Sequence, residues 1–287
     1  MSGAEYFSDQ FAINALMNSS AVVDKPRAII EHSKVRQAME DAGIQVVKVA
    51  APNDLQDGIY TANWALVNNG LALMSRLPNK RKGEEAYALR YLKEVGLETR
   101  LLPENVQAFS GQGDALPCGN IVFVQSPYRT SIEAHPYIKS ILGFDKLIAL
   151  RTKPSRILRI GPAKRNKVTG WPDSPTYDLD LAIAVLKWPS KNHKGLIGWC
   201  PAVFKRSSSN LIRNLDAVDK IEVSKEEALK AYALNLVSTG ETVIMNAGAP
   251  RFQAAIEKHG LKTITLDLPE LKKGGGSIRC VTLTLEN

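Results

Sequence analysis

The sequence predicts an α/β fold built from five repeated modules, each running strand, strand, helix, strand (ββαβ). Three observations support this prediction. A helical segment that runs into a β-rich strand recurs five times, pairs of short apolar strands lie between these joints, and no Gly/Ser-rich linker interrupts the 287 residues. Five such units arranged radially, as an α/β propeller, would close on themselves and bring strand ends to one central pocket. We therefore expect one domain, residues 1–287.

The helix-to-strand joints define the modules in chain order. They lie near positions 43, 96, 143, 217 and 260, in the segments 37–49, 90–102, 137–150, 211–223 and 253–266. Four of the five segments carry a glycine at the joint, and only 211–223 lacks it. Glycine adopts the left-handed conformation that ends many helices, and an alternating or apolar strand follows each joint.

The strands that precede each helix are read from apolar runs and turn residues. Residues 59–74 read as a pair of strands joined by the turn Asn69-Gly70, and 236–245 as a pair joined by Thr239-Gly240. The segments 120–124 and 177–186 fit the same role. Residues 153–175 form the longest excursion between elements, and the radial arrangement would place this loop beside the mouth of the pocket.

Composition excludes several classes of protein. Hydrophobic residues make up 44% of the chain, so disorder is excluded. No apolar run approaches the roughly 18–20 residues of a membrane span, and the first residues lack the basic and apolar regions of a secretory signal. The three cysteines show no metal-binding spacing. We expect a cytoplasmic protein without metal or cofactor.

The net charge of +8 raises the question of nucleic-acid binding. The densest basic run, 153–167, has no acidic residue and contains Lys153, Arg156, Arg159, Lys164, Arg165 and Lys167. No aromatic residue is interleaved on which bases could stack, and no nucleic-acid-binding motif occurs elsewhere. A solvated loop is therefore favoured over nucleic-acid binding, which stays open as an alternative hypothesis.

Six motifs follow one another along the chain. They are Asp57-Gly-Ile-Tyr-Thr-Ala-Asn63-Trp64, Arg81-Lys-Gly-Glu84, Phe109-Ser110-Gly111-Gln112-Gly113-Asp114, Tyr128-Arg129-Thr130, Tyr177-Asp178-Leu-Asp180 and Gly274-Gly-Gly-Ser-Ile-Arg-Cys280. Singly each is weak. In this order they resemble the guanidine-modifying (pentein) superfamily, which includes dimethylarginine dimethylaminohydrolase, arginine deiminase and amidinotransferases and has a five-bladed α/β propeller fold.

The resemblance implies Cys-dependent chemistry on a guanidino or ureido group of arginine or an arginine derivative. Cys280 would be the nucleophile that forms a covalent thiouronium. Asp180 would pair with the guanidinium from one side, and Asp57 and Asn63 from the other. Arg81 and Arg129 would bind the α-carboxylate of an amino-acid substrate. Asp114 reads as a structural residue that holds the glycine-rich turn.

Two positions depart from the family pattern. Asp178 stands where the family has the histidine of its H-x-D motif, and Ser110 stands where it has a substrate-binding glutamate. On a strand, Asp178 and Asp180 would point to the same face, and two neighbouring carboxylates can leave one protonated as an acid. We therefore expect this pair to be catalytic beside Cys280, in place of the histidine, and Ser110 to be a substrate-binding residue. His32, His135, His193 and His259 all fall outside the motif; His135 and His259 read as surface residues, and His193 as a loop residue.

Two further alternatives stay open. The chain is either an active hydrolase or amidinotransferase, or a degenerate member that binds a guanidinium ligand or a protein partner without turnover. Retention of Cys280 and Asp180 favours the first, and loss of the histidine and glutamate motivates the second. The expected partner is a small guanidino compound, without membrane association, and a homodimer is one open alternative.

Overall fold

The structure, a computed structural model, describes residues 1–17, 22–157 and 161–286. Within these ranges four three-stranded sheets follow one another along the chain. In every sheet the first strand is antiparallel to the second, and the third is parallel to the second. The sheets are β1 (Ala65–Asn68), β2 (Leu71–Met74) and β3 (Glu98–Arg100); β4 (Ala115–Cys118), β5 (Ile121–Gln125) and β6 (Lys146–Leu150); β7 (Ile183–Lys187), β8 (Gly195–Trp199) and β9 (Val218–Glu222); β10 (Val237–Ser238), β11 (Thr242–Asn246) and β12 (Lys262–Leu266).

A helix connects the second and third strand of each sheet, because parallel neighbours need a crossover. These helices are α2 (Lys82–Glu94), α3 (His135–Leu142), α4 (Arg206–Arg213) and α6 (Pro250–Lys258). The others are α1 (Lys25–Asp41), α5 (Lys225–Lys230) and α7 (Pro269–Lys273). Asp24 caps α1 by accepting a hydrogen bond from the Arg27 amide, and Gly143 ends α3 in the left-handed conformation.

The repeated ββαβ module is confirmed four times, and the mixed α/β class with it. The fifth module does not form a sheet within the described residues. The N-terminal region contributes α1 and one isolated parallel bridge, between Ser2 and Val49. Residues 281–286 form no strand; within them, the Gln112 side chain accepts a hydrogen bond from the Thr284 amide at 2.9 Å and donates one to the Thr284 carbonyl at 2.8 Å. A five-bladed propeller thus remains a prediction.

Two predicted strand pairs are shorter than expected. The hairpin at Asn69-Gly70 is present, but residues 59–64 precede it as a turn that includes the 3₁₀ helix η1 (Thr61–Asn63). Likewise 177–186 begins with the 3₁₀ helix η5 (Leu179–Leu181) before β7. The prediction that Asp178 and Asp180 share a strand face is therefore wrong. The Ala182 amide donates to the Leu179 carbonyl at 2.8 Å and tightens this segment into a turn.

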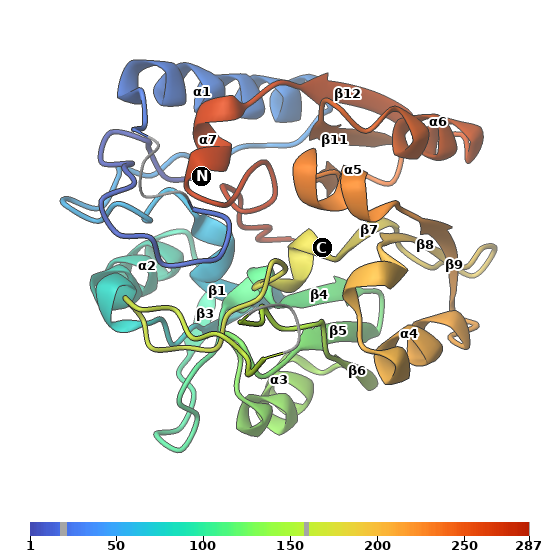
Figure 1. The fold of residues 1–287 in the computed structure, drawn as a ribbon, viewed down its shortest axis with the longest axis horizontal. Helices are drawn as coiled ribbons and strands as arrows, with labels where there is room; N and C mark the ends of the chain where they lie inside the picture. The colour runs from blue at the N-terminus through green and yellow to red at the C-terminus, as the bar shows by residue number, and fades with distance from the viewer. Residues whose placement is uncertain (18–21, 158–160, 287) are drawn as a thin grey trace.

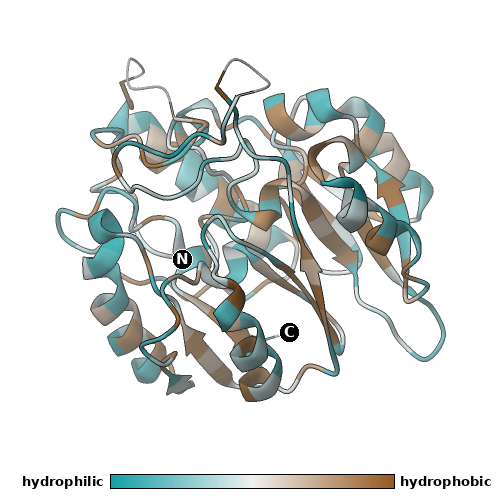
Figure 2. Cartoon of the chain, turned by 60° about the horizontal axis from the view of Figure 1, so that its bottom comes forward, coloured by the Kyte–Doolittle hydropathy of each residue, from teal (hydrophilic) through white to brown (hydrophobic). Residues whose placement is uncertain are grey.

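The modules lie in chain order around a central region, with the connecting helices on the outside (Figure 1). The strands are largely hydrophobic, and the helices turn many hydrophilic residues outward (Figure 2). The largest buried cluster contains residues of the second, third and fourth sheets along the chain, with Trp199, Phe204 and Phe252 at most 2% exposed. No helix within the described ranges is long and apolar enough to cross a membrane.

The loop 153–175 lies against the N-terminal segment. Asn166 Nδ2 donates to the Ala12 carbonyl at 2.9 Å, and Arg129 Nη2 donates to the neighbouring Ile13 carbonyl, also at 2.9 Å. Lys164 and Arg165 of the basic run are exposed, as expected for a solvated loop. Arg159 lies outside the described residues.

Candidate active site

Polar side chains enter the centre of the molecule from the turns that precede the first strand of each module. The turn η1 precedes β1 and carries Asn63, the 3₁₀ helix η3 (Gly111–Gly113) precedes β4, and η5 precedes β7 and carries Asp180. Gly111 has φ +54°, and a Cβ there would lie 2.6 Å from the Ala65 carbonyl oxygen, so this turn packs on η1 only with glycine. The repeated fold thereby brings residues from distant parts of the sequence to one site.

Cys280 reaches this site from the turn after α7. Gly275 has φ +85°, and a Cβ on Gly276 would lie 2.6 Å from the Tyr60 ring. The triple glycine therefore lets the backbone pass against Tyr60, whose hydroxyl donates to the Leu271 carbonyl at 3.0 Å. This close approach accounts for the glycine-rich sequence before the cysteine.

The Cys280 thiol is 3% exposed and contacts two polar side chains. Its Sγ lies 3.3 Å from Asp180 Oδ2 and 3.1 Å from Asn235 Nδ2. Burial raises the pKa of the thiol well above its usual range, and the carboxylates of Asp180 and Asp178 raise it further. In the ligand-free protein the thiol is therefore protonated at neutral pH.

This protonation predicts how Cys280 reacts with iodoacetamide. Because the pKa is raised above the ordinary 9.0, the thiolate fraction at pH 7 is below about 1%, and labelling is expected to accelerate continuously from pH 7 to pH 9. The measurement is mass spectrometry of the Cys280 peptide as a function of time and pH, with N-acetylcysteine in the same solution as reference. A plateau of the labelling rate below pH 8 would contradict the raised pKa.

Asn235, which the sequence analysis did not single out, positions the thiol. Its Oδ1 accepts hydrogen bonds from the amides of Ser277 and Arg279, each at 3.1 Å, while its Nδ2 donates to the thiol sulfur. Asn235 lies two residues before β10, as Asn63 lies two residues before β1. The repeat of the modules was thus the signal that could have identified it.

Asp178 is held by two neutral donors. Ser110 Oγ donates to Asp178 Oδ1 at 3.0 Å, and Asn63 Nδ2 donates to Asp178 Oδ2 at 2.9 Å. All three side chains are at most 3% exposed. Ser110 and Asp178, the two residues that depart from the family pattern, therefore hydrogen-bond to each other, and Asn63 hydrogen-bonds to both.

Asp57 and Asp180 each have one buried carboxylate oxygen without a hydrogen-bond partner in the described part of the chain. Burial raises the pKa of Asp57 to about 6, against the opposing effect of Arg81. Burial, followed by the Asp178 charge, raises the pKa of Asp180 to about 8. A buried carboxylate oxygen without a partner is costly, so each of these two oxygens is available to a hydrogen-bond donor of a bound cation.

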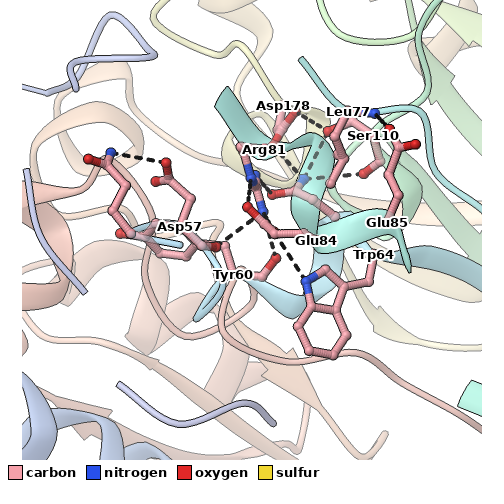
Figure 3. A network of polar contacts seen from close by, with 11 residues as sticks. Asp57, Tyr60, Trp64, Leu77, Arg81, Glu84, Glu85, Ser110 and Asp178 are labelled. Carbon is pink, nitrogen blue, oxygen red and sulfur yellow. Dashed lines mark hydrogen bonds and ion pairs between the residues drawn. The ribbon is translucent and has the colours of Figure 1, made fainter. Parts of the chain in front are cut away.

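Arg81 has a different place from the one predicted. Its guanidinium is 1% exposed and lies at the centre of a polar network (Figure 3). It donates to both carboxylate oxygens of Glu84 at 2.7 Å and to Asn63 Oδ1 at 2.8 Å, and Nη2 also faces the backbone carbonyls of Asp57 and Tyr60. With these partners Arg81 orients Asn63 and Asp57, and this geometry does not support the predicted contact with a substrate carboxylate.

Arg129 and Asp114 complete the buried polar set. Arg129 is 5% exposed and lies over the Tyr177 ring, 4.2 Å from its centroid. Asp114 accepts hydrogen bonds from Thr130 Oγ1 at 2.8 Å and from the Leu179 amide at 3.1 Å. Asp114 thus links its own turn, η3, to Thr130 and to Leu179 of η5, in agreement with the structural role expected for it.

The histidines lie apart from these groups. Among the described residues no histidine hydrogen-bonds to Cys280, Asp178 or Asp180. His193 is exposed in the loop between β7 and β8, and His259 is exposed after α6. His135, expected at the surface, is half-buried, and desolvation lowers its pKa.

A cavity of about 790 Å³ borders the site. Its lining includes Asp180, Thr61 and Arg279, together with apolar side chains of β7 and of the C-terminal residues. Cys280, Asp57 and Asp178 do not line it. Asp180 therefore contacts the Cys280 thiol and also lines the cavity, whereas Asp178 does not line it.

A buried cysteine beside carboxylates, carried on repeated ββαβ modules, is the arrangement expected of the guanidine-modifying superfamily. Relatives in sequence support this class. The chain is 29% identical over 290 residues to N(G),N(G)-dimethylarginine dimethylaminohydrolase of Mycobacterium tuberculosis, covering 99% of this chain and 84% of that protein. It is 25% identical to the bifunctional arginine dihydrolase/ornithine cyclodeaminase ArgZ of Synechocystis, of whose length it spans 36%. No family model matches the chain.

Solved structures show the fold. The N-terminal domain of ArgZ, an arginine dihydrolase of cyanobacteria, bound to substrate, superimposes with a TM-score of 0.84 at 24% identity, over 100% of this chain and 97% of that one. A dimethylarginine dimethylaminohydrolase adduct superimposes with a TM-score of 0.67 at 18% identity, over 94% and 95%. The chain thus has the mixed α/β fold of these proteins, and the comparisons support its membership of the guanidine-modifying superfamily.

Proposed function

We propose that this protein is a hydrolase that acts on a C–N bond of the guanidino group of arginine or an arginine derivative, with Cys280 as nucleophile. One observation carries the proposal: Cys280 Sγ lies 3.3 Å from Asp180, and both Asp180 and Asp57 keep an unpartnered buried oxygen. A guanidinium is planar and cationic, so it would pair with these two oxygens and present its central carbon to the sulfur.

The chemistry follows from the site. A bound cation would lower the pKa of the thiol, and the thiolate would attack the guanidinium carbon to give a tetrahedral adduct, which loses an amine or ammonia and leaves a covalent thiouronium on Cys280. Attack by water on this intermediate would then yield a ureido product. The chain's own residues suffice for these steps, in one guanidine-modifying domain of five modules and without a cofactor.

The proposed substrate class rests on the names of two relatives and on the charge of one buried arginine. One relative is named for dimethylarginine and another for arginine dihydrolysis. Arg129 is the buried cation available for an α-carboxylate, since Glu84 and Asn63 already occupy Arg81. Arginine and its N-methylated derivatives are therefore the first compounds to test.

A second candidate is a non-catalytic guanidinium-binding protein. It is favoured by Asp178, which stands at the histidine position and has both oxygens occupied by Ser110 and Asn63. An amidinotransferase would share the first covalent step and differ only in the acceptor.

The test separates these functions. The protein is incubated with arginine, methylated arginines and other guanidino compounds, and ureido products, ammonia and amines are quantified alongside the intact mass. A ureido product together with a transient adduct on Cys280 is expected. Product formed only when an acceptor amine is added would indicate an amidinotransferase. Thermal stabilisation by arginine without product or adduct would indicate a binding protein and would refute the hydrolase.

A further inference from the structure

The proposed hydrolysis needs a group that moves protons, and this inference rests on that proposed function. The nitrogen that leaves must receive a proton, and the attacking water must lose one. Asp178 occupies the position of the family's histidine, yet no histidine among the described residues contacts the site. The structure offers two buried carboxyl groups for this task, Asp178 and Asp180, and their contacts differ.

Asp178 sits at the end of a chain of directed hydrogen bonds. Arg81 can only donate, and its Nη1 lies 2.8 Å from Asn63 Oδ1, so the Asn63 amide turns its NH₂ toward Asp178 and Ser110. Because Asn63 Nδ2 donates to Ser110 Oγ at 2.9 Å, the Ser110 hydroxyl proton points to Asp178 Oδ1. Both Asp178 oxygens therefore accept hydrogen bonds. A proton added to either oxygen would point toward a group that already donates a hydrogen bond to that oxygen.

Asp180 has the opposite environment. Its Oδ2 meets the Cys280 thiol, and its Oδ1 is buried and unpartnered. A proton from the thiol can therefore reach one oxygen, while the other accepts no hydrogen bond from a described residue; the Asn235 amide and the Arg279 charge near Asp180 only partly oppose the rise of its pKa. Asp180 also borders the cavity, which Asp178 does not.

We propose that Asp180 carries the proton in each step, and that Asp178 stays ionised as a fixed counter-charge to the guanidinium. This gives Asp180, which the family resemblance casts as a substrate-pairing residue, a second and catalytic task. Its pKa is raised to about 8 without a bound cation, and pairing with the guanidinium would lower it, which leaves the carboxylate ionised to take the thiol proton.

The thiol proton moves to Asp180 while Sγ forms a bond to the guanidinium carbon. The carbon–nitrogen bond then breaks, Asp180 donates its proton to the departing nitrogen, and a thiouronium remains on Cys280. Water adds to the carbon as Asp180 takes one of its protons. The carbon–sulfur bond breaks, the protonated urea returns a proton to Sγ, and the proton on Asp180 leaves with the released ammonia as ammonium.

The leaving group tests this assignment. L-Arginine must lose ammonia, which requires a proton, whereas its S-methylisothiourea analogue loses methanethiolate, which does not. In Asp180→Asn, the burst of first product from arginine is expected to fall by about 10²–10⁴-fold. The burst from the isothiourea is expected to fall less, because this substrate loses only the transfer of the thiol proton to Asp180 and not the proton that Asp180 donates to the leaving group. The thiouronium should then accumulate on Cys280 because water is not activated. Intact-mass spectrometry detects the adduct.

The matched variant is Asp178→Asn, which removes a buried carboxylate of the same site. If Asp178 is only a counter-charge, Asp178→Asn should lower the burst rate with arginine and with the isothiourea, which are both cations, by the same factor. The assignment is overturned if Asp180→Asn lowers both bursts equally, or if Asp178→Asn discriminates between the leaving groups instead.

The wild-type protein gives a second measurement, independent of whether the variants fold. A larger solvent deuterium isotope effect on the burst is expected for arginine than for the isothiourea, and equal effects would refute the assignment. If the wild type releases neither ammonia nor methanethiol and forms no adduct, the proposed hydrolase itself fails. Turnover of both substrates with equal losses in Asp180→Asn refutes this inference alone.

Discussion

Replacing Cys280 with alanine is expected to lower turnover of the guanidino substrate by at least about 10⁴-fold, because no covalent intermediate can form without the sulfur. Sγ is the only atom of this side chain that contacts Asp180 and Asn235, so its removal leaves the carboxylates in place. Binding of arginine, measured as a thermal shift, should persist. The rate is measured as ureido product formed at saturating substrate.

Cys118→Ala is the matched control. Cys118 is also a buried thiol, at the end of β4, and burial likewise raises its pKa, to about 12, but it belongs to the largest apolar cluster. The expected rate is that of the wild type. A Cys280→Ala protein that still forms product at the wild-type rate would exclude the covalent mechanism.

Replacing Arg81 with methionine is expected to lower the free energy of unfolding by about 3–5 kcal/mol, the usual cost of breaking a buried ion pair from one side. Arg81 and Glu84 are each about 1% exposed on their side chains and lie 2.7 Å apart. Without the guanidinium, the Glu84 carboxylate and Asn63 Oδ1 lose their buried partner. Urea denaturation followed by tryptophan fluorescence measures the change.

Arg90→Met is the control for this prediction. Arg90 also pairs with a glutamate on α2, Glu94, but both side chains are more than half exposed, at 59% and 56%. Such pairs contribute about 0–1 kcal/mol, so little change is expected. The double variant Arg81→Met/Glu84→Leu should recover part of the stability, since no unpaired charge remains. Equal losses in Arg81→Met and Arg90→Met would contradict the structural role of Arg81.

The repeated module was predictable because it depends on local chemistry. Gly43, Gly96, Gly143 and Gly260 all adopt positive φ after helices, as the glycine pattern indicated. The hairpin at Asn69-Gly70 formed for the same reason. The turns η1 and η5 were not predicted, since three-residue 3₁₀ helices have no apolar period of their own and read as extensions of the strands that follow.

The candidate site was predictable in its members but not in its connections. The motifs pointed to Cys280, Asp180, Asp178, Asn63 and Ser110, and the structure brings these five side chains to the centre of the molecule. Arg81 was given a substrate contact because a motif shows which residue is present and not which partner it has. Asn235 was missed because it belongs to no motif, although it holds the thiol.

Patterns in the amino-acid sequence were enough to predict repeated ββαβ modules and a cysteine, after three glycines, that would act together with carboxylates suited to a guanidinium. These features follow from backbone preference and residue chemistry, which are local. The folded chain was needed to show that Asp180 contacts the thiol and that Asp178 accepts hydrogen bonds from Ser110 and Asn63. That choice depends on turns from three modules, between 47 and 115 residues apart in the sequence, packing against one another. Because such contacts involve no local pattern, Asp178 and Asp180 differ only once the chain has folded.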